Sequence, residues 1–133
     1  DDYSVINNYK QIMGVEIPNI GQLKIMTLKS FNVRNISNLT IITVNYEQQD
    51  TDVLASEIKN NNNWILSTEL PSTLEKLVPT AFASNNNIYY LFYNKTLDEY
   101  NTLPLNSVNY EVFTIKYDIS KKILIIYSFY YNK

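Results

Sequence analysis

The sequence contains no histidine and no cysteine, and these two absences exclude several classes of chemistry. Without an imidazole the chain cannot form a Ser-His-Asp triad, and without a thiol it has no cysteine nucleophile. A zinc site built from imidazole and thiolate ligands is excluded for the same reason, and so is a disulfide framework. The catalytic groups that remain are carboxylates, hydroxyls and lysines.

Glycine and arginine are also scarce. Only two glycines are present, Gly14 and Gly21, so the usual glycine-rich loops that hold phosphates are absent. Arg34 is the single arginine, and the lysines are scattered, with Lys121 and Lys122 forming the only adjacent basic pair. The formal net charge is -2, whereas binding to a phosphate backbone depends on clustered basic residues. The sequence therefore predicts no nucleic-acid partner, no cofactor and no metal.

Long apolar runs are missing as well. None approaches the roughly 18 residues that a spanning helix needs. The chain starts at Asp1 without an initiator methionine, so we expect a further segment upstream. Any attachment to a membrane is expected to go through that segment.

What the chain does contain is typical of one globular domain over residues 1–133, with 45% hydrophobic and 18% charged residues. Helical spacing of apolar residues predicts an opening helix that ends at Gly14. A second helix is predicted at 51–59, with Asp50 as a cap. Alternation of apolar and polar residues, or a short apolar run, predicts strands at 22–33, 37–47, 85–94, 107–117 and 122–131, and a further short strand at 64–66.

This order predicts an α+β fold, an antiparallel sheet of about five to six strands with two to three helices packed on one face. A turn is expected at residues 34–36, where asparagine takes the role that glycine normally has. Residues 118–121 are expected to form a tight hairpin connection.

Residues 60–79 carry the only tryptophan, directly after four asparagines. We interpret Trp64 as a structural anchor that packs in the core and holds a short helix against the sheet. Ser72 and Glu75 have the spacing of a capping box at the start of that helix, which ends before Pro79. The alternative, a stacking platform for a base or sugar, is less favoured because no basic groove is visible.

Tyrosine is the most informative surplus, with twelve residues, many of them in the predicted strands. On alternating strands about half of these rings face away from one core. Tyrosine is favoured at binding surfaces because it combines an apolar body with a polar tip. We therefore predict a binding surface on the outer sheet face, and its candidate residues are Tyr89, Tyr93, Tyr110 and Tyr130.

The acidic residues offer no comparable signal. The densest group is at 47–52, with Glu57 beyond; it lacks the alternating ligands and the glycine of a calcium loop and is interpreted as a solvated turn. A glycosidase needs two carboxylates that converge in a cleft, which a sequence does not reveal. Glu69 and Glu111 are no better candidates than any other pair, so no catalytic residue is assigned.

Four motifs together resemble a family of uncharacterised small extracytoplasmic proteins, anchored or secreted, from low-GC Gram-positive bacteria, with no assigned activity. They are the G-x-x-I-P signal at 14–18, the N-x-x-W…L-P…L segment at 61–74, the YYxFYN strand at 89–94 and the YD…LxxYxFxY hairpin at 117–131. The resemblance covers almost the whole chain. It departs at 31–38, where the family has a turn rich in histidine, glycine and aspartate.

The resemblance implies a cell-surface or secreted location, with the cytoplasm as the alternative. The function expected is that of a non-catalytic domain that binds an unknown protein or glycan through the aromatic sheet face. Two alternatives stay open, a carboxylate-dependent hydrolase and a small acidic inhibitor or immunity-type protein that is steered to a basic toxin.

Overall fold

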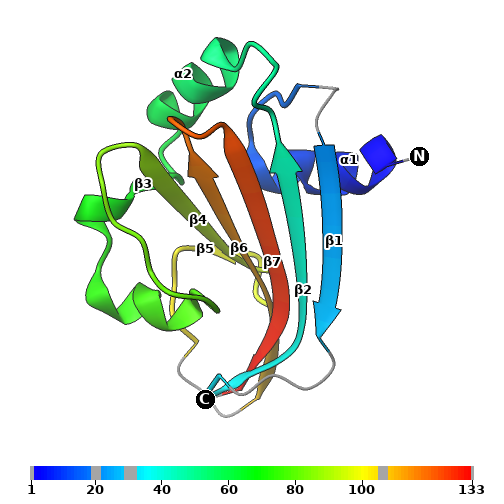
Figure 1. Ribbon diagram of the computed structural model, residues 1–133. Coiled ribbons are helices and arrows are strands. Elements are labelled where there is room, and N and C mark those ends of the chain that lie inside the picture. The colour runs from blue at the N-terminus through cyan, green and yellow to red at the C-terminus, as the bar shows by residue number, and fades with distance from the viewer. Residues whose placement is uncertain (1, 19–21, 29–32, 105–107, 133) are drawn as a thin grey trace.

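The computed structural model describes residues 2–18, 22–28, 33–104 and 108–132, and it is an α+β structure built on one antiparallel sheet (Figure 1). The two 3-10 helices are labelled η. The elements in chain order are α1 (Asp2–Met13), β1 (Gln22–Leu28), β2 (Ile36–Asn45), α2 (Asp52–Asn60), β3 (Ile65–Leu66), η1 (Ser67–Glu69), η2 (Ser72–Leu77), β4 (Ile88–Asn94), β5 (Glu99–Tyr100), β6 (Asn109–Asp118) and β7 (Ile123–Asn132).

The sheet has seven strands in the order β1-β2-β7-β6-β4-β3, and β5 also pairs with β4. All neighbouring strands are antiparallel, which confirms the predicted fold class. The prediction missed β5, a strand of only two residues. Residues 29–32 and 107, which belonged to predicted strands, lie outside the described residues.

One face of the sheet is covered by α1 and α2 (Figure 1), as predicted for these two helices. Ile6 and Met13 of α1, together with Leu54 and Ile58 of α2, pack against sheet residues such as Ile126. Buried apolar residues at helical spacing form this contact because they share one face of each helix. We call this side of the sheet the α face.

The exit from α1 also follows the prediction. Gly14 has φ +67°, and its N–H donates to the Lys10 carbonyl at 3.0 Å. A Cβ at this position would lie 2.9 Å from Nδ2 of Asn61, so both the backbone and the space favour glycine.

Trp64 packs in the core of the α face with 5% of its surface exposed, as predicted. Its indole Nε1 donates to the Met13 carbonyl at 2.9 Å. The tryptophan therefore anchors the end of α1. The prediction that it holds the short helix at residues 72–77 against the sheet is wrong, because that helix packs in a separate core.

That short helix, η2, covers the opposite face of the sheet, which we call the η face. Leu74 and Leu77 pack there with Val78 against a second set of buried sheet residues that includes Phe92 and Phe129. Buried Thr114 joins the two layers, because its hydroxyl donates to the Leu77 carbonyl at 2.6 Å. The third predicted helix thus lies on the other side of the sheet from α1 and α2.

The predicted capping box does not form. Residues 72–77 adopt a 3-10 helix whose N-cap is Pro71, and no side-chain hydrogen bond caps it. The Leu74 N–H is instead satisfied by the Pro71 carbonyl at 3.0 Å. Ser72 and Glu75 were predicted to exchange hydrogen bonds as N-cap and N3. In the structure Ser72 lies one position inside the helix, where its side chain no longer has the N-cap geometry.

Asparagine and aspartate supply the left-handed backbone that the scarce glycines do not. Positive φ angles occur at Asn35 (73°), Asn38 (53°), Asp98 (52°) and Asn101 (58°). This confirms the role predicted for asparagine in the turn before β2, since asparagine tolerates this region better than most residues.

The hairpin between β6 and β7 is held by Asp118, whose Oδ1 accepts the N–H groups of Ser120 and Lys121 at 3.0 and 3.1 Å.

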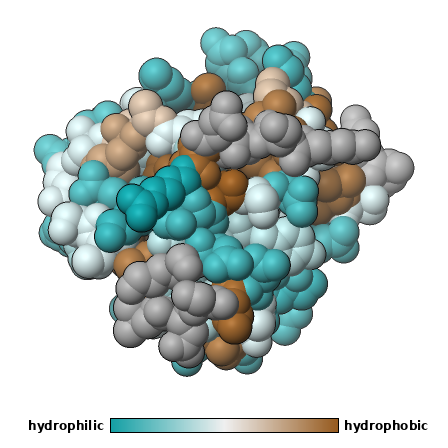
Figure 2. Space-filling view, turned by 90° about the horizontal axis from the view of Figure 1, so that it is seen from below, coloured by the Kyte–Doolittle hydropathy of each residue, from teal (hydrophilic) through white to brown (hydrophobic). Residues whose placement is uncertain are grey.

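Seen from the end at which the C-terminus lies, hydrophobic residues form small areas separated by hydrophilic ones (Figure 2).

Candidate functional site

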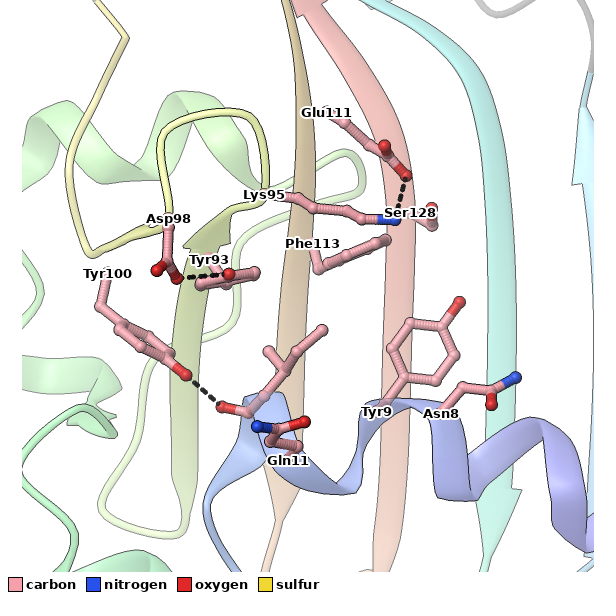
Figure 3. A pocket seen from close by; sticks show the side chains of 11 residues that line it. Asn8, Tyr9, Gln11, Tyr93, Lys95, Asp98, Tyr100, Glu111, Phe113 and Ser128 are labelled. Atoms are coloured by element: carbon pink, nitrogen blue, oxygen red, sulfur yellow. Dashed lines mark hydrogen bonds and ion pairs between the residues drawn. The ribbon is translucent and has the colours of Figure 1, made fainter.

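A groove of about 800 Å³ lies on the α face between α1 and strands β4 to β7 (Figure 3). Helix α1 crosses only part of this face, so the sheet beside it remains open. The residues that line the groove are Asn8, Tyr9, Gln11, Ile12, Tyr93, Lys95, Asp98, Tyr100, Glu111, Phe113 and Ser128.

Strand register aligns the floor of the groove. Tyr93 of β4 pairs with Tyr100 of β5 on one side and with Phe113 of β6 on the other, and Phe113 pairs with Ser128 of β7. Directly opposed residues on antiparallel strands point to the same face. Three aromatic rings and a hydroxyl therefore form one row across the sheet.

The rings of this row pack against each other and against α1. The Tyr93 and Tyr100 centroids are 4.9 Å apart, and the Tyr93 and Phe113 rings are stacked at 6.4 Å. Tyr9 of α1 meets Phe113 edge to face at 5.4 Å. Offset and edge-to-face contacts of this kind stabilise aromatic clusters. These contacts therefore fix the orientation of the rings in this row.

Two tyrosine hydroxyls at the groove have fixed partners. The Tyr93 hydroxyl donates to Oδ1 of Asp98 at 2.6 Å, and the Tyr100 hydroxyl donates to the Ile12 carbonyl at 2.8 Å. The hydrogen bond to Asp98, with smaller contributions from burial and from the nearby charges, raises the pKa of Tyr93 to about 12. Burial, and secondarily Asp98, raises the pKa of Tyr100. Both tyrosines therefore remain neutral donors at physiological pH.

The polar side of the groove carries an ion pair. Nζ of Lys95 lies 3.8 Å from the Glu111 carboxylate, and both side chains are partly exposed. The Glu111 N–H donates to the Thr96 hydroxyl at 2.9 Å, which ties the strand to the turn after β4. Burial raises the pKa of Tyr9, and Glu111 raises it further. Asp98 and Glu111 together outnumber Lys95, so the charged groups at the groove carry a net negative charge.

The structure divides the four tyrosines predicted to form the binding surface. Tyr93 lines the groove, while Tyr89 lies on the same face but packs against the core. Tyr130 is 40% exposed and pairs with Glu111, so it continues the α face beyond the groove. The prediction for Tyr110 is wrong: it is 4% exposed and belongs to the core of the η face. The η layer covers that side of the sheet, which the sequence prediction left open.

Several groove residues were not predicted from the sequence. Tyr9 was not singled out as a site residue, and Asp98 and Tyr100 lie in a hairpin that was not recognised. The sequence held one indication of Asp98. A tight turn between paired strands often needs a residue with positive φ, and aspartate tolerates that conformation, which Asp98 adopts. Glu111 was named only as one of many equivalent carboxylates, together with Glu69, which does not line the groove.

The acidic stretch at 47–52 forms a turn before α2. Asp50 lies one position before the N-cap, which is Thr51, so it is not the predicted cap; its Oδ1 accepts the Asp52 N–H at 3.0 Å in a local turn. The Glu57 carboxylate accepts the Glu16 N–H at 3.3 and 3.4 Å. Among the described residues, no three acidic side chains are grouped as metal ligands.

Comparison of the chain with protein-family models, with curated proteins and with solved structures finds no match. In the parts of the chain that the structure describes, no helix has the length and apolar character needed to cross a membrane.

Proposed function

We propose that this protein is a non-catalytic domain that binds an oligosaccharide in the α-face groove. The observation that carries the proposal is the composition of the groove. Four aromatic rings, those of Tyr9, Tyr93, Tyr100 and Phe113, lie among six polar or charged side chains. This arrangement matches the apolar face and the hydroxyl edge of a sugar ring.

A pyranose has an apolar face of C–H groups and an edge of hydroxyls that both donate and accept hydrogen bonds. Aromatic rings cover the apolar face, since they are large and rigid and their geometry is already fixed. The amides of Asn8 and Gln11 are exposed on α1, and each can donate to one hydroxyl and accept from another. The carboxylates of Asp98 and Glu111 can accept hydrogen bonds from further hydroxyls.

The dimensions of the groove support a chain of sugars. Its volume of about 800 Å³ is within the range of small-molecule sites, roughly 300 to 1,000 Å³. Tyr130 continues the same face directly beside Glu111. A linear oligosaccharide can therefore contact the row of rings and extend toward Tyr130.

A glycan fits this surface better than a protein does. Protein interfaces of standard size bury about 800 Å² on each partner and place aromatic residues on a broad exposed area. Here Tyr9, Tyr93 and Tyr100 are half-buried within the hollow, and Phe113 is buried. A hollow with recessed rings favours a narrow ligand.

A carboxylate-dependent hydrolase is the second candidate, and the observation in its favour is that Asp98 and Glu111 line the same groove. Two carboxylates on either side of a glycosidic bond are what hydrolysis requires. Both are already engaged, Asp98 by the Tyr93 hydroxyl and Glu111 by Lys95. We therefore favour binding over hydrolysis.

The proposal also places the protein outside the cytoplasmic membrane, where the resemblance of its motifs points. Neutral glycans of the cell surface are accessible there. Fractionation of cells that express the gene at its natural locus tests this part separately. Recovery of the protein in the cytoplasm alone would contradict the location without affecting the groove.

The test is isothermal titration calorimetry of the whole chain with neutral oligosaccharides, including β-1,4-linked glucose and N-acetylglucosamine chains. Tyr93→Leu and Tyr89→Leu form a matched pair, because both residues lie on β4 and face the α side, but only Tyr93 lines the groove. We expect Tyr93→Leu to weaken binding at least about tenfold, equal to about 1.4 kcal/mol. Tyr89→Leu is expected to leave the affinity within about twofold once its folding is verified.

Asn8→Ala and Asn7→Ala provide a second matched pair. Both asparagines are exposed neighbours on α1, and only Asn8 lines the groove. Weaker binding for Asn8→Ala alone supports the proposal. The absence of binding to every sugar in the panel, or equal effects of the paired variants, would overturn it. Release of reducing ends during incubation would favour the hydrolase.

A further inference from the structure

Strand β1 forms one edge of the sheet, and it is exposed along its length. Five of its seven residues are exposed, and Leu23 and Leu28 are half-buried. The strand is the last in the sheet order, and no strand among the described residues pairs with its outer side. Among the residues that the structure describes, no partner is found for its outward backbone N–H and C=O groups, and such groups can pair with another extended chain.

The side chains of β1 are unusually apolar for such an edge. Ile25 is 50% exposed and Met26 is 44% exposed, and they are adjacent. Lys24 is the only charged residue in the strand, there is no proline, and the pairing with β2 runs without a bulge. Charges, prolines and bulges are the features by which proteins protect exposed edges. This edge carries only one of them.

The opposite edge of the sheet offers only short strands. It consists of β3 and β5, two strands of two residues each, which pair with the outer side of β4. Between them, Asn101 takes the place of a strand residue, because its N–H and its Oδ1 bind the carbonyl and the N–H of Phe92 at 2.8 and 3.1 Å. A head-to-tail extension through both edges is therefore disfavoured. An isologous pairing of β1 with itself remains, and it closes a dimer.

We propose that β1 is a dimerisation edge, at which two copies of this chain pair their β1 strands antiparallel about a two-fold axis through Ile25. This register is the one that pairs all seven residues, since it sets Ile25 opposite Ile25 of the second copy. Lys24 then opposes Met26, so no like charges meet and the lysine stem covers the methionine. The two sheets become one continuous sheet.

The interface is small, so the dimer is weak. Seven paired residues bury less than the 1,200 Å² or more typical of stable complexes. We expect a reversible dimer whose population rises with concentration over the range of about 10 µM to about 1 mM, where weak associations are measured. The groove lies across α1 and β4 to β7, so this inference does not depend on the proposed function.

Sedimentation velocity over that concentration range is the first test. We expect Ile25→Lys and Met26→Lys to abolish the dimer, because an added charge on a strand edge opposes pairing. Val53→Lys is the matched control, since Val53 is 68% exposed on α2, away from the edge. A wild-type chain that stays monomeric throughout, including the case in which β1 pairs with another protein, would overturn the proposal.

The absence of cysteine allows a sharper test of the register. Directly opposed residues have Cα atoms about 4.5 to 5.5 Å apart, which suits a disulfide, so Ile25→Cys is expected to form a covalent dimer on mild oxidation. Thr27 is exposed two residues further on, where the register opposes it to Leu23. Two Thr27→Cys positions are then about 13 Å apart along the strands, too far for a disulfide.

We expect Ile25→Cys to cross-link at least about tenfold faster than Thr27→Cys, because both positions are exposed but only Ile25 lies opposite its own copy. Val53→Cys reports the rate of random collisions. Thermal unfolding of each reduced variant confirms that it is folded. Equal cross-linking of the Ile25→Cys and Thr27→Cys variants would contradict this pairing.

Discussion

At the level of single residues, two tyrosines of the groove have hydroxyls that are bonded to the protein itself. Tyr93 and Tyr100 use their hydroxyls on Asp98 and on the Ile12 carbonyl. These hydrogen bonds fix each ring, and under the proposed function the two residues would contribute their ring surfaces to binding. Rigid aromatic side chains lose little conformational entropy when a ligand arrives.

Asp98→Asn tests the coupling between Tyr93 and Asp98. The pKa of Tyr93 is raised from 10.0 to about 12, so its neutral form stabilises the fold below pH 10, and this contribution is lost as the pH rises toward 12. Removing the charge of Asp98 lowers the pKa of Tyr93 toward its ordinary value. We therefore expect the variant to lose less stability than the wild type between pH 10 and pH 12.

Asparagine tolerates the positive φ of residue 98, so the backbone is preserved. Nuclear magnetic resonance of the tyrosine ring carbons gives the pKa of Tyr93, and urea unfolding gives the stability at each pH. Asp52→Asn, at the exposed start of α2, is the control. An unchanged Tyr93 titration in Asp98→Asn would contradict the assignment.

Trp64→Phe tests the anchor of α1. Phenylalanine keeps an aromatic ring in the core but leaves the Met13 carbonyl without its donor. An unpaired buried carbonyl costs about 1 to 3 kcal/mol, and we expect the free energy of unfolding to fall by this amount. Urea unfolding followed by circular dichroism is the measurement, because the variant has no tryptophan fluorescence.

Tyr130→Phe is the control for Trp64→Phe, because it also removes one polar hydrogen but at a site that is 40% exposed. Its effect is expected to stay within about 0.5 kcal/mol. Equal stability of Trp64→Phe and the wild type would show that the indole hydrogen bond does not hold α1.

At this scale the sequence was informative about Trp64 and misleading about Tyr110. The burial of Trp64 was predictable because apolar Ile65 and Leu66 follow it and no basic groove surrounds it. Tyr110 and Tyr93 both lie in alternating strands, and alternation tells which residues share a face but not what covers that face. The layers over the two faces distinguish them, since Tyr110 belongs to the core of the η face and Tyr93 lies in the groove beside α1.

At the level of elements, Asn101 completes the edge of β4. Its N–H and side-chain oxygen bind the Phe92 backbone, and its side-chain Nδ2 donates to the Asn63 carbonyl at 2.9 Å. One residue with φ 58° thus joins β5, β4 and the loop before β3. This arrangement keeps the hairpin that carries Asp98 and Tyr100 against the sheet.

Asn101→Gly is expected to lower the free energy of unfolding by about 1 to 3 kcal/mol, because the backbone is accommodated but both side-chain hydrogen bonds are lost. Asn38→Gly is the matched control, since Asn38 has φ 53° and is exposed. Both variants gain the same freedom in the unfolded chain, so their difference isolates the side-chain contacts. Chemical unfolding measures it, and equal effects would contradict the role of Asn101.

The regular elements were predictable because periodicity marks them over many residues. The apolar spacing of α1 and the alternation of β6 and β7 are each sustained over about ten residues. β5 has two residues and no pattern of its own, so it was missed. The helix at η2 was recognised, but its 3-10 geometry and its N-cap at Pro71 depend on how the chain returns to the sheet.

At the level of the whole molecule, the sheet separates two hydrophobic cores and contributes residues to both. Ile115 and Leu124 contribute to the core of the α face, while their strand neighbours Thr114 and Ile125 face the η side. This explains why the consecutive residues 112–115 of β6 are all buried, although neighbours along a strand face opposite sides of the sheet. The part of the α face that α1 leaves open is the groove.

The α+β class was predictable from the order of the elements, but the two-sided arrangement was not. Helices on one face were expected because two amphipathic helices and a short third one suffice to cover one side of a sheet. The residues that cover the other side are a 3-10 helix and an irregular loop, which carry little periodicity. The groove depends on where α1 crosses the sheet, which no local pattern encodes.

The most direct test of the account is a nuclear magnetic resonance titration of the nitrogen-labelled chain with the neutral oligosaccharide that binds best. The account predicts that amide shifts change along the groove, at Asn8 and Gln11 on α1 and at Tyr93 on β4, while Leu74 and Leu77 of η2 stay unchanged. Shift changes centred on the η face, or none at saturating sugar, would contradict it.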